Sequence, residues 1–118
     1  MRAYIAYDEG GIEELGEIER DGVLPLIDRA DASLSKKSQF GVGFCRSKKD
    51  FLEVRPVGKS EYLLWSDAIA KAGSAGFLGL FFRRKAHIDK IVAGRDAAAT
   101  AVYYYMDYPR ETFERKYG

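Results

Sequence analysis

Hydrophobic and polar residues alternate through the middle of the chain in a pattern typical of β-strands. Apolar side chains occupy every second position from Phe40 to Phe44, and a period of two returns over residues 51–57 and 61–66. Polar turns of only a few residues separate these segments. The pattern therefore predicts an antiparallel β-meander over residues 40–66.

The segments before the meander show two different periods. Residues 2–7 alternate and predict a short strand. Residues 12–19 carry isoleucine and leucine three apart with glutamates between them, which predicts an amphipathic helix with an acidic first turn. The apolar residues 23–27 are interrupted by a proline, so their state stays open, and residues 30–38 are small and polar and predict a loop.

The chain after the meander is mostly helical in pattern. A mostly apolar stretch predicts a further strand near residues 77–84, and Ile88, Ile91 and Val92 predict a short helix. Residues 95–108 are alanine-rich with apolar positions at helical spacing, and a last helical piece starts at Pro109. This order predicts an α+β fold: one domain, residues 1–118, with an antiparallel sheet packed against helices.

Length and composition favour a folded cytoplasmic protein. The chain has 118 residues, of which 47% are hydrophobic and 14% aromatic, enough for a core. Its sole cysteine, Cys45, cannot form an internal disulfide. The first residues lack the apolar region of a signal peptide, and no apolar stretch approaches the roughly 20 residues that span a bilayer. We therefore expect no membrane association.

The net charge of +1 disfavours a dedicated nucleic-acid-binding protein, whose domains are usually strongly basic. The charges are unevenly distributed, however. Residues 1–31 hold 9 acidic and 3 basic side chains, whereas residues 32–118 hold 9 acidic and 16 basic ones. Such asymmetry can steer a charged partner toward one part of the surface.

The sequence contains no motif that predicts catalysis, a metal site or a cofactor site. Cys45 and His87 are the only cysteine and histidine, too few for a zinc site, and the acidic residues lack the spacing of a calcium loop. The glycines of residues 73–79 match no phosphate-binding loop. We therefore predict that the protein is not an enzyme and uses no cofactor.

Aromatic residues raise two further hypotheses. The segment Phe40–Phe44, with Tyr4–Tyr7, partly resembles the base-stacking strands of RNA-recognition motifs, but a turn follows where that fold needs a helix, so these aromatics are more consistent with a core. Tyr103, Tyr104 and Tyr105 are consecutive in a predicted helix and point about 100° apart. At least one of them should be buried and one exposed, and exposed tyrosines are common in protein interfaces.

Four segments of the C-terminal part of the chain form a recognisable pattern: Phe51–Val54, Tyr62–Asp67, the aromatic and basic segment Phe81–Lys85, and the ending Tyr103–Tyr117. In this pattern, which covers roughly residues 50–117, the chain resembles the small immunity proteins of bacterial contact-dependent growth inhibition and related polymorphic-toxin systems. The resemblance implies a cytosolic protein that binds one cognate toxin domain, such as a nuclease, and blocks it.

We infer from this resemblance a set of partner-binding candidates. Acidic residues of the predicted first helix would complement the basic cleft of a nuclease, and tyrosines of the last long helix would contact the partner. These candidates are Glu13, Glu14, Glu17, Asp21, Tyr104 and Tyr108. Two alternatives remain: a nucleic-acid-binding module that uses sheet aromatics, and a small enzyme or ligand-binding protein with a pocket that contains His87 or Cys45.

Overall fold

A computed structural model describes residues 1–47, 49–66 and 88–118 and places six strands in one sheet, in the order β2-β1-β3-β4-β5-β6. All neighbouring strands are antiparallel. The elements in chain order are β1 (Arg2–Tyr7), β2 (Ile12–Glu17), the short 3-10 helix η1 (Arg20–Gly22), α1 (Val23–Ser33), β3 (Phe40–Ser47), β4 (Asp50–Gly58), β5 (Glu61–Ser66), β6 (Ile88–Ala93), α3 (Arg95–Asp107) and α4 (Arg110–Tyr117).

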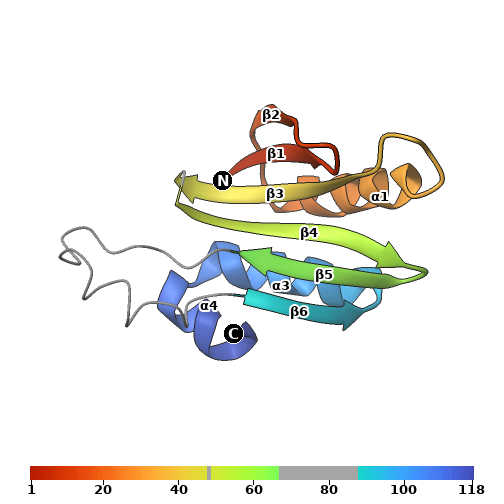
Figure 1. Ribbon diagram of the computed structural model, residues 1–118. Coiled ribbons are helices and arrows are strands. Elements are labelled where there is room, and N and C mark those ends of the chain that lie inside the picture. The colour runs from red at the N-terminus through yellow and green to blue at the C-terminus, as the bar shows by residue number, and fades with distance from the viewer. Residues whose placement is uncertain (48, 67–87) are drawn as a thin grey trace, which may run out of the picture.

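The helices lie on one face of this sheet, which we call the helix face (Figure 1). β1 and β2 form a hairpin at one edge of the sheet. The chain then runs through α1 across the helix face and returns as β3 on the other side of β1. β3, β4 and β5 form the meander that alternation predicted over residues 40–66, and the α+β class is confirmed.

The first long helix, α1, starts in the apolar segment whose state the sequence left open. Pro25 is the third residue of α1, and a backbone N–H in the first turn needs no partner within the helix, so proline is compatible with this position. The loop predicted over residues 30–38 is wrong at its start, because α1 continues to Ser33. The Ser33 hydroxyl donates to the Ala30 carbonyl at 2.6 Å and accepts from the Phe40 amide at 3.1 Å, which joins the helix end to β3.

The helix predicted over residues 12–19 is wrong: the segment forms strand β2, paired with β1. Gly16 lies inside it, and a glycine within a helix costs about 1 kcal/mol relative to alanine. Gly10 adopts a φ of 108° in the β1–β2 turn, which brings the two strands into a hairpin. Cross-strand pairing with β1 therefore overrides the helical spacing of the apolar residues.

The short helix predicted at Ile88, Ile91 and Val92 is also wrong, because residues 88–93 form strand β6 beside β5. Ile88 pairs with Ser66 and Val92 pairs with Tyr62, so an even spacing places both on the helix face. These β-branched residues suit a strand. The strand predicted near residues 77–84, the glycines of residues 73–79 and His87 lie outside the described residues.

The core lies between the sheet and helices α1 and α3. Ala98, Ala101, Val102 and Tyr105 share the buried side of α3, as their spacing predicted. Of the three consecutive tyrosines, Tyr105 is buried, as expected for at least one of them, whereas Tyr103 and Tyr104 are half-buried and neither is fully exposed. None of the helices in the described ranges is long and apolar enough to cross a membrane.

Asp50, at the start of β4, bonds to side chains of both C-terminal helices and so connects them to the sheet. Its carboxylate accepts a hydrogen bond from the Tyr105 hydroxyl at 2.7 Å and forms ion pairs with Arg46 and Arg110 at 3.1 and 3.3 Å. Arg46 also donates to the carbonyl of Tyr108 at 2.6 Å, beyond the end of α3, where a cation complements the helix dipole. Strand ends and helix ends are therefore held by one hydrogen-bonded cluster.

We predict that alkaline pH destabilises the protein through its buried tyrosines. The hydroxyls of Tyr62 and Tyr105 donate to Asp31 and Asp50, and burial together with these carboxylates raises the pKa of both phenols. Above about pH 10 the unfolded chain loses these phenolic protons while the folded chain retains them, so the free energy of unfolding falls as pH rises. Urea unfolding from pH 8 to pH 11 measures this fall.

In the variant Tyr105→Phe, the free energy of unfolding should decrease less over this pH range, because the variant lacks one of the two phenols with a raised pKa. Tyr108→Phe, at an exposed tyrosine, serves as the control. Equal pH dependence of Tyr105→Phe and the unmodified protein would contradict the assignment.

Candidate functional site

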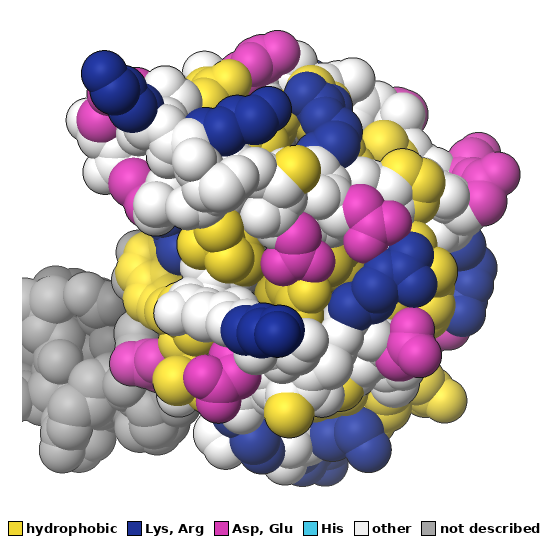
Figure 2. Space-filling model, turned by 90° about the vertical axis from the view of Figure 1, so that its right-hand side faces the viewer, with side chains coloured by type: hydrophobic (Ala, Val, Ile, Leu, Met, Phe, Trp, Pro, Cys, Tyr) yellow, Lys and Arg dark blue, Asp and Glu magenta, His cyan; other side chains and the backbone are white. Residues whose placement is uncertain are grey.

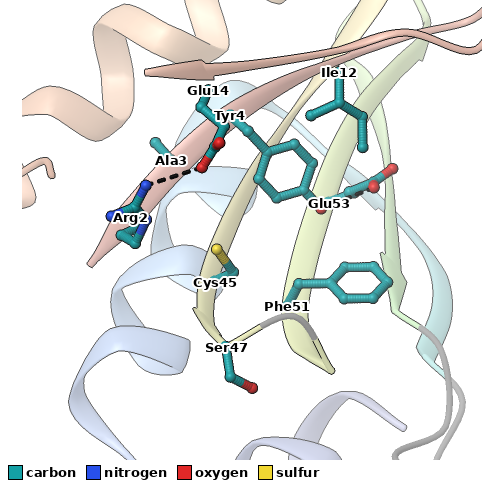
Figure 3. A pocket seen from close by; sticks show the side chains of 9 residues that line it. All are labelled: Arg2, Ala3, Tyr4, Ile12, Glu14, Cys45, Ser47, Phe51 and Glu53. Atoms are coloured by element: carbon teal, nitrogen blue, oxygen red, sulfur yellow. Dashed lines mark hydrogen bonds and ion pairs between the residues drawn. The ribbon is translucent and has the colours of Figure 1, made fainter. Parts of the chain in front are cut away.

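A pocket of about 420 Å³ opens on the face of the sheet opposite α1, α3 and α4, which we call the pocket face. It spans strands β2, β1, β3 and β4 (Figure 3). Its volume falls within the range typical of ligand and anchor-residue sites. The residues that line it are Arg2, Ala3, Tyr4, Ile12, Glu14, Cys45, Ser47, Phe51 and Glu53.

The ring of Tyr4 lies in the middle of the pocket (Figure 3). It covers the backbone of Gly43, its cross-strand partner. A Cβ atom at position 43 would lie 2.0 Å from Cζ of Tyr4. Only glycine at this position therefore permits the close approach of the ring, as expected for glycine within a strand. Gly43 pairs on its other side with Glu53, so Tyr4, Gly43 and Glu53 form one row across three strands.

Glu53 places a largely buried carboxylate at the side of the pocket, with a side chain only 10% exposed. Its Oε2 accepts a hydrogen bond of 2.8 Å from the Tyr4 hydroxyl, and its Oε1 lies 3.4 Å from the Arg55 guanidinium. Arg55 also pairs with Asp8 in the β1–β2 turn. Burial and the neighbouring Glu53 charge raise the pKa of Tyr4, so its phenol stays protonated and continues to donate.

A β-bulge in β2 decides which glutamates face the pocket. Tyr4 pairs with Glu14 and Ala3 with Gly16, so Leu15 is an extra residue in β2, and Gly16 adopts a φ of 89°. In a regular strand, Glu14 and Glu17 would point to opposite faces because they are three apart. The bulge places both on the pocket face.

The two β2 glutamates on the pocket face, Glu14 and Glu17, form ion pairs but are largely exposed. Glu14 forms an ion pair of 2.9 Å with Arg2, and Glu17 one of 3.0 Å with the N-terminal amine. Their side chains are 73% and 71% exposed, and exposed pairs of this kind contribute little stability. Both carboxylates therefore remain accessible to a partner. Glu13, by contrast, pairs with Ile5 on the helix-face side and accepts a hydrogen bond from Tyr7 at 2.9 Å.

Cys45 and Phe51 form the apolar part of the pocket near Tyr4 (Figure 3). Phe51 packs against Trp65, with ring centroids 5.6 Å apart. Burial raises the pKa of the Cys45 thiol, the opposite of the shift that activates a nucleophilic cysteine.

The structure does not bring the predicted partner-binding residues onto one face. Glu14 and Glu17 lie on the pocket face, Glu13 lies on the opposite side, and Asp21 is an exposed residue of η1. The acidic face of a helix that was expected to carry them does not exist, because β2 is a strand.

Tyr104 and Tyr108 lie together at the end of α3. Their rings stack with centroids 4.4 Å apart, Lys116 lies 5.2 Å from the Tyr104 ring centroid, and Tyr108 is 47% exposed. Arg20 in η1 binds Asp107 through two hydrogen bonds of 2.6 and 2.7 Å. This ion pair links the turn that carries Asp21 to the helix end that carries Tyr108.

The ring of Phe44, the last residue of the segment that resembled an RNA-binding strand, is fully buried on the helix face. It belongs to the core, as the sequence favoured, and cannot stack on a base. Within the described ranges, no group of three or more histidine, cysteine or acidic side chains is arranged to hold a metal ion.

Sequence reasoning missed the Glu53 carboxylate and the role of Gly43. The available signal was the pair Gly41 and Gly43, two glycines at alternate positions of an otherwise apolar strand, which marks a close approach by neighbouring groups. The Arg55 side chain covers Gly41 as Tyr4 covers Gly43: a Cβ at Gly41 would lie 2.5 Å from Cγ of Arg55.

Comparison of the chain with models of protein families, with curated proteins and with solved structures finds no match.

We predict that Tyr4→Phe lowers the free energy of unfolding by about 1–3 kcal/mol, because the largely buried Glu53 carboxylate loses its shortest hydrogen bond. Tyr7→Phe is the matched control: it removes a tyrosine hydroxyl bond of similar length to the exposed Glu13, where water replaces it. Urea unfolding of both variants measures the difference. Equal decreases in the free energy of unfolding would show that the hydrogen bond from Tyr4 to Glu53 contributes no more stability than the exposed one.

We further predict that Gly16→Ala destabilises the hairpin by about 1–2 kcal/mol, since an L-residue is strained at positive φ. Gly11→Ala is the control, because Gly11 has no positive φ and a Cβ there meets only Tyr7 at an ordinary 3.7 Å. Thermal unfolding compares the two variants. A loss in Gly11→Ala as large as that in Gly16→Ala would refute the requirement for glycine at the bulge.

Proposed function

We propose that the chain is an immunity protein that binds a cognate bacterial toxin domain in the cytoplasm and neutralises it. The observation that carries the proposal is the acidic edge, the hairpin and turn of residues 1–22 at one side of the sheet. This edge holds seven acidic side chains, all exposed, against two basic ones. The acidic residues are Asp8, Glu9, Glu13, Glu14, Glu17, Glu19 and Asp21.

An exposed acidic edge suits a basic partner. A nuclease toxin needs positive charge to hold phosphate, and complementary charge accelerates encounter and disfavours partners of the wrong sign. Part of this charge is compensated locally. At the end of the sheet that carries the β1–β2 and β4–β5 turns, basic and acidic side chains are interspersed (Figure 2), and Asp8 is paired there with Arg55.

The structure disfavours the nucleic-acid alternative by burying Phe44, and an acidic edge repels phosphate. The alternative of a small ligand-binding protein keeps some support, since Cys45 lies in a pocket beside polar groups. The pocket adjoins the acidic edge through Ile12 and Glu14, so it fits equally well into a protein-binding surface.

The test is capture followed by growth rescue. The tagged chain is used to retain proteins from its source organism at moderate and high salt, and the retained domain is then expressed in a bacterium with and without the chain. We expect one stoichiometric partner that stops growth alone and not in the presence of the chain. Recovery of nucleic acid without a protein partner, or a partner whose toxicity the chain does not relieve, would overturn the proposal.

We predict that neutralising two carboxylates of the acidic edge slows association. Glu14→Gln combined with Glu17→Gln should lower the association rate with the captured partner several-fold at low salt, and the difference should shrink at high salt because ions screen exposed charges. Stopped-flow or surface-binding kinetics measure the rates.

Asp96→Asn combined with Glu111→Gln is the matched control, as it removes two exposed carboxylates from the starts of α3 and α4. It should leave the rate nearly unchanged. Equal slowing by both pairs would mean that net charge, and not the acidic edge, governs encounter.

A further inference from the structure

We propose that the pocket receives the side chain of an arginine presented by the protein partner. This inference rests on the proposed function and adds to it an anchor point at the centre of the interface. Acidic steering brings a basic surface to the edge of the sheet, and the pocket then takes one guanidinium from that surface.

The walls of the pocket suit a long side chain with a planar cationic end. Ile12 and Cys45 supply apolar surface for methylene groups, and Tyr4 and Phe51 supply aromatic rings. A guanidinium is attracted to an aromatic face and is less strongly hydrated than an ammonium, so it loses less on entering a partly apolar cavity. The volume of about 420 Å³ is sufficient for one such side chain.

The charges of the lining favour a cation. Two carboxylates, Glu14 and Glu53, line the pocket against one guanidinium, that of Arg2. Arg2 is already engaged by Glu14 at 2.9 Å. Among the cations of the described residues, Glu53 has only the 3.4 Å contact with Arg55, and Arg55 also pairs with Asp8. The Glu53 carboxylate therefore repels an anion and stabilises a cation.

Glu53 retains the capacity to accept hydrogen bonds. A carboxylate has about four acceptor sites on its two oxygens. The contacts to Tyr4 at 2.8 Å and to Arg55 at 3.4 Å use one site well and a second one weakly. An incoming guanidinium donates up to five hydrogen bonds in a planar fork, so it matches the acceptors that remain.

The position of the pocket agrees with the role of an anchor. Arginine is enriched among the residues that dominate binding energy, and such residues sit in pockets surrounded by contacts that exclude water. Here Ile12 and Glu14 of β2 belong both to the pocket and to the acidic edge. The same partner surface can therefore reach both.

The test uses small probes on the intact chain and needs no partner. N-acetyl-arginine amide is titrated into isotope-labelled protein and followed by amide NMR shifts, with N-acetyl-citrulline amide as the uncharged probe of the same shape. We expect a dissociation constant on the order of 1 mM for the arginine probe, with shifts centred on Tyr4, Gly43, Cys45 and Glu53, and binding at least about tenfold weaker for the citrulline probe. The arginine probe should also slow alkylation of Cys45, the sole thiol in the chain.

Two neighbouring glutamates provide matched variants. Glu14→Gln should weaken the arginine probe several-fold, and Glu13→Gln, one residue away on the other side of the sheet, should not change it. Glu53→Gln should weaken it further, provided that its amide spectrum remains that of a folded chain. Because Glu14 is exposed, its variant keeps the test decisive even if Glu53→Gln unfolds.

Two results would overturn the inference: pocket shifts that are equal for the arginine and citrulline probes, or none up to the solubility limit of the arginine probe. If either result is obtained and a toxin is nevertheless captured and neutralised, the arginine site is refuted and the immunity function stands. Arginine binding with no protein partner in the capture experiment would instead refute the immunity function and leave the pocket as a cation-binding site.

Discussion

The Asp50 carboxylate is the point on which the arrangement of sheet and helices depends. It receives the Tyr105 hydroxyl from α3 and the guanidiniums of Arg46 and Arg110, which in turn bind backbone carbonyls at the ends of neighbouring elements. A largely buried acid with two basic partners and a phenol is stable only when all of them are present. The cluster therefore holds α3 and α4 on the helix face.

The helices cover one face of the sheet, and the register of the strands determines which side chains meet on the pocket face. Gly41 and Gly43 supply no side chains there, so Arg55 and Tyr4 from the flanking strands fold over the bare backbone. Their polar ends meet at Glu53, which is held by one good and one long contact. The two missing side chains thus allow Tyr4 and Arg55 to lie close to the sheet and to converge on a largely buried carboxylate at the side of the pocket.

The sequence was informative where local pattern and pairing agree. Over residues 40–66 the alternation of apolar residues and the short turns both specify an antiparallel meander, and the alanine-rich face of α3 specifies a helix packed closely on a core. Both were predicted. The error at residues 12–19 has a clear cause: the apolar residues three apart do not share a face. Ile12 lies on the pocket face, whereas Leu15 and Ile18 pack against the core.

The site was less accessible from sequence than the fold. Tyr4, Gly43 and Glu53 are distant along the chain and meet only through the order of β1, β3 and β4, in which β3 joins the far side of β1. Similarly, nothing local indicates that Glu14 and Glu17 share a face, because this depends on the bulge between them. Predicting the pocket requires the register of two strand pairs, and register depends on contacts that a single sequence does not display.

The bulge at Leu15 and Gly16 also bears on how other chains can approach. β2 is an edge strand, and its outward N–H and C=O groups would accept a strand from another molecule, including a second copy. A bulge twists the edge and interrupts the regular ladder, and glutamates at Glu13, Glu14 and Glu17 repel a like-charged copy. The same residues that make this edge acidic therefore protect it against self-assembly into extended sheets.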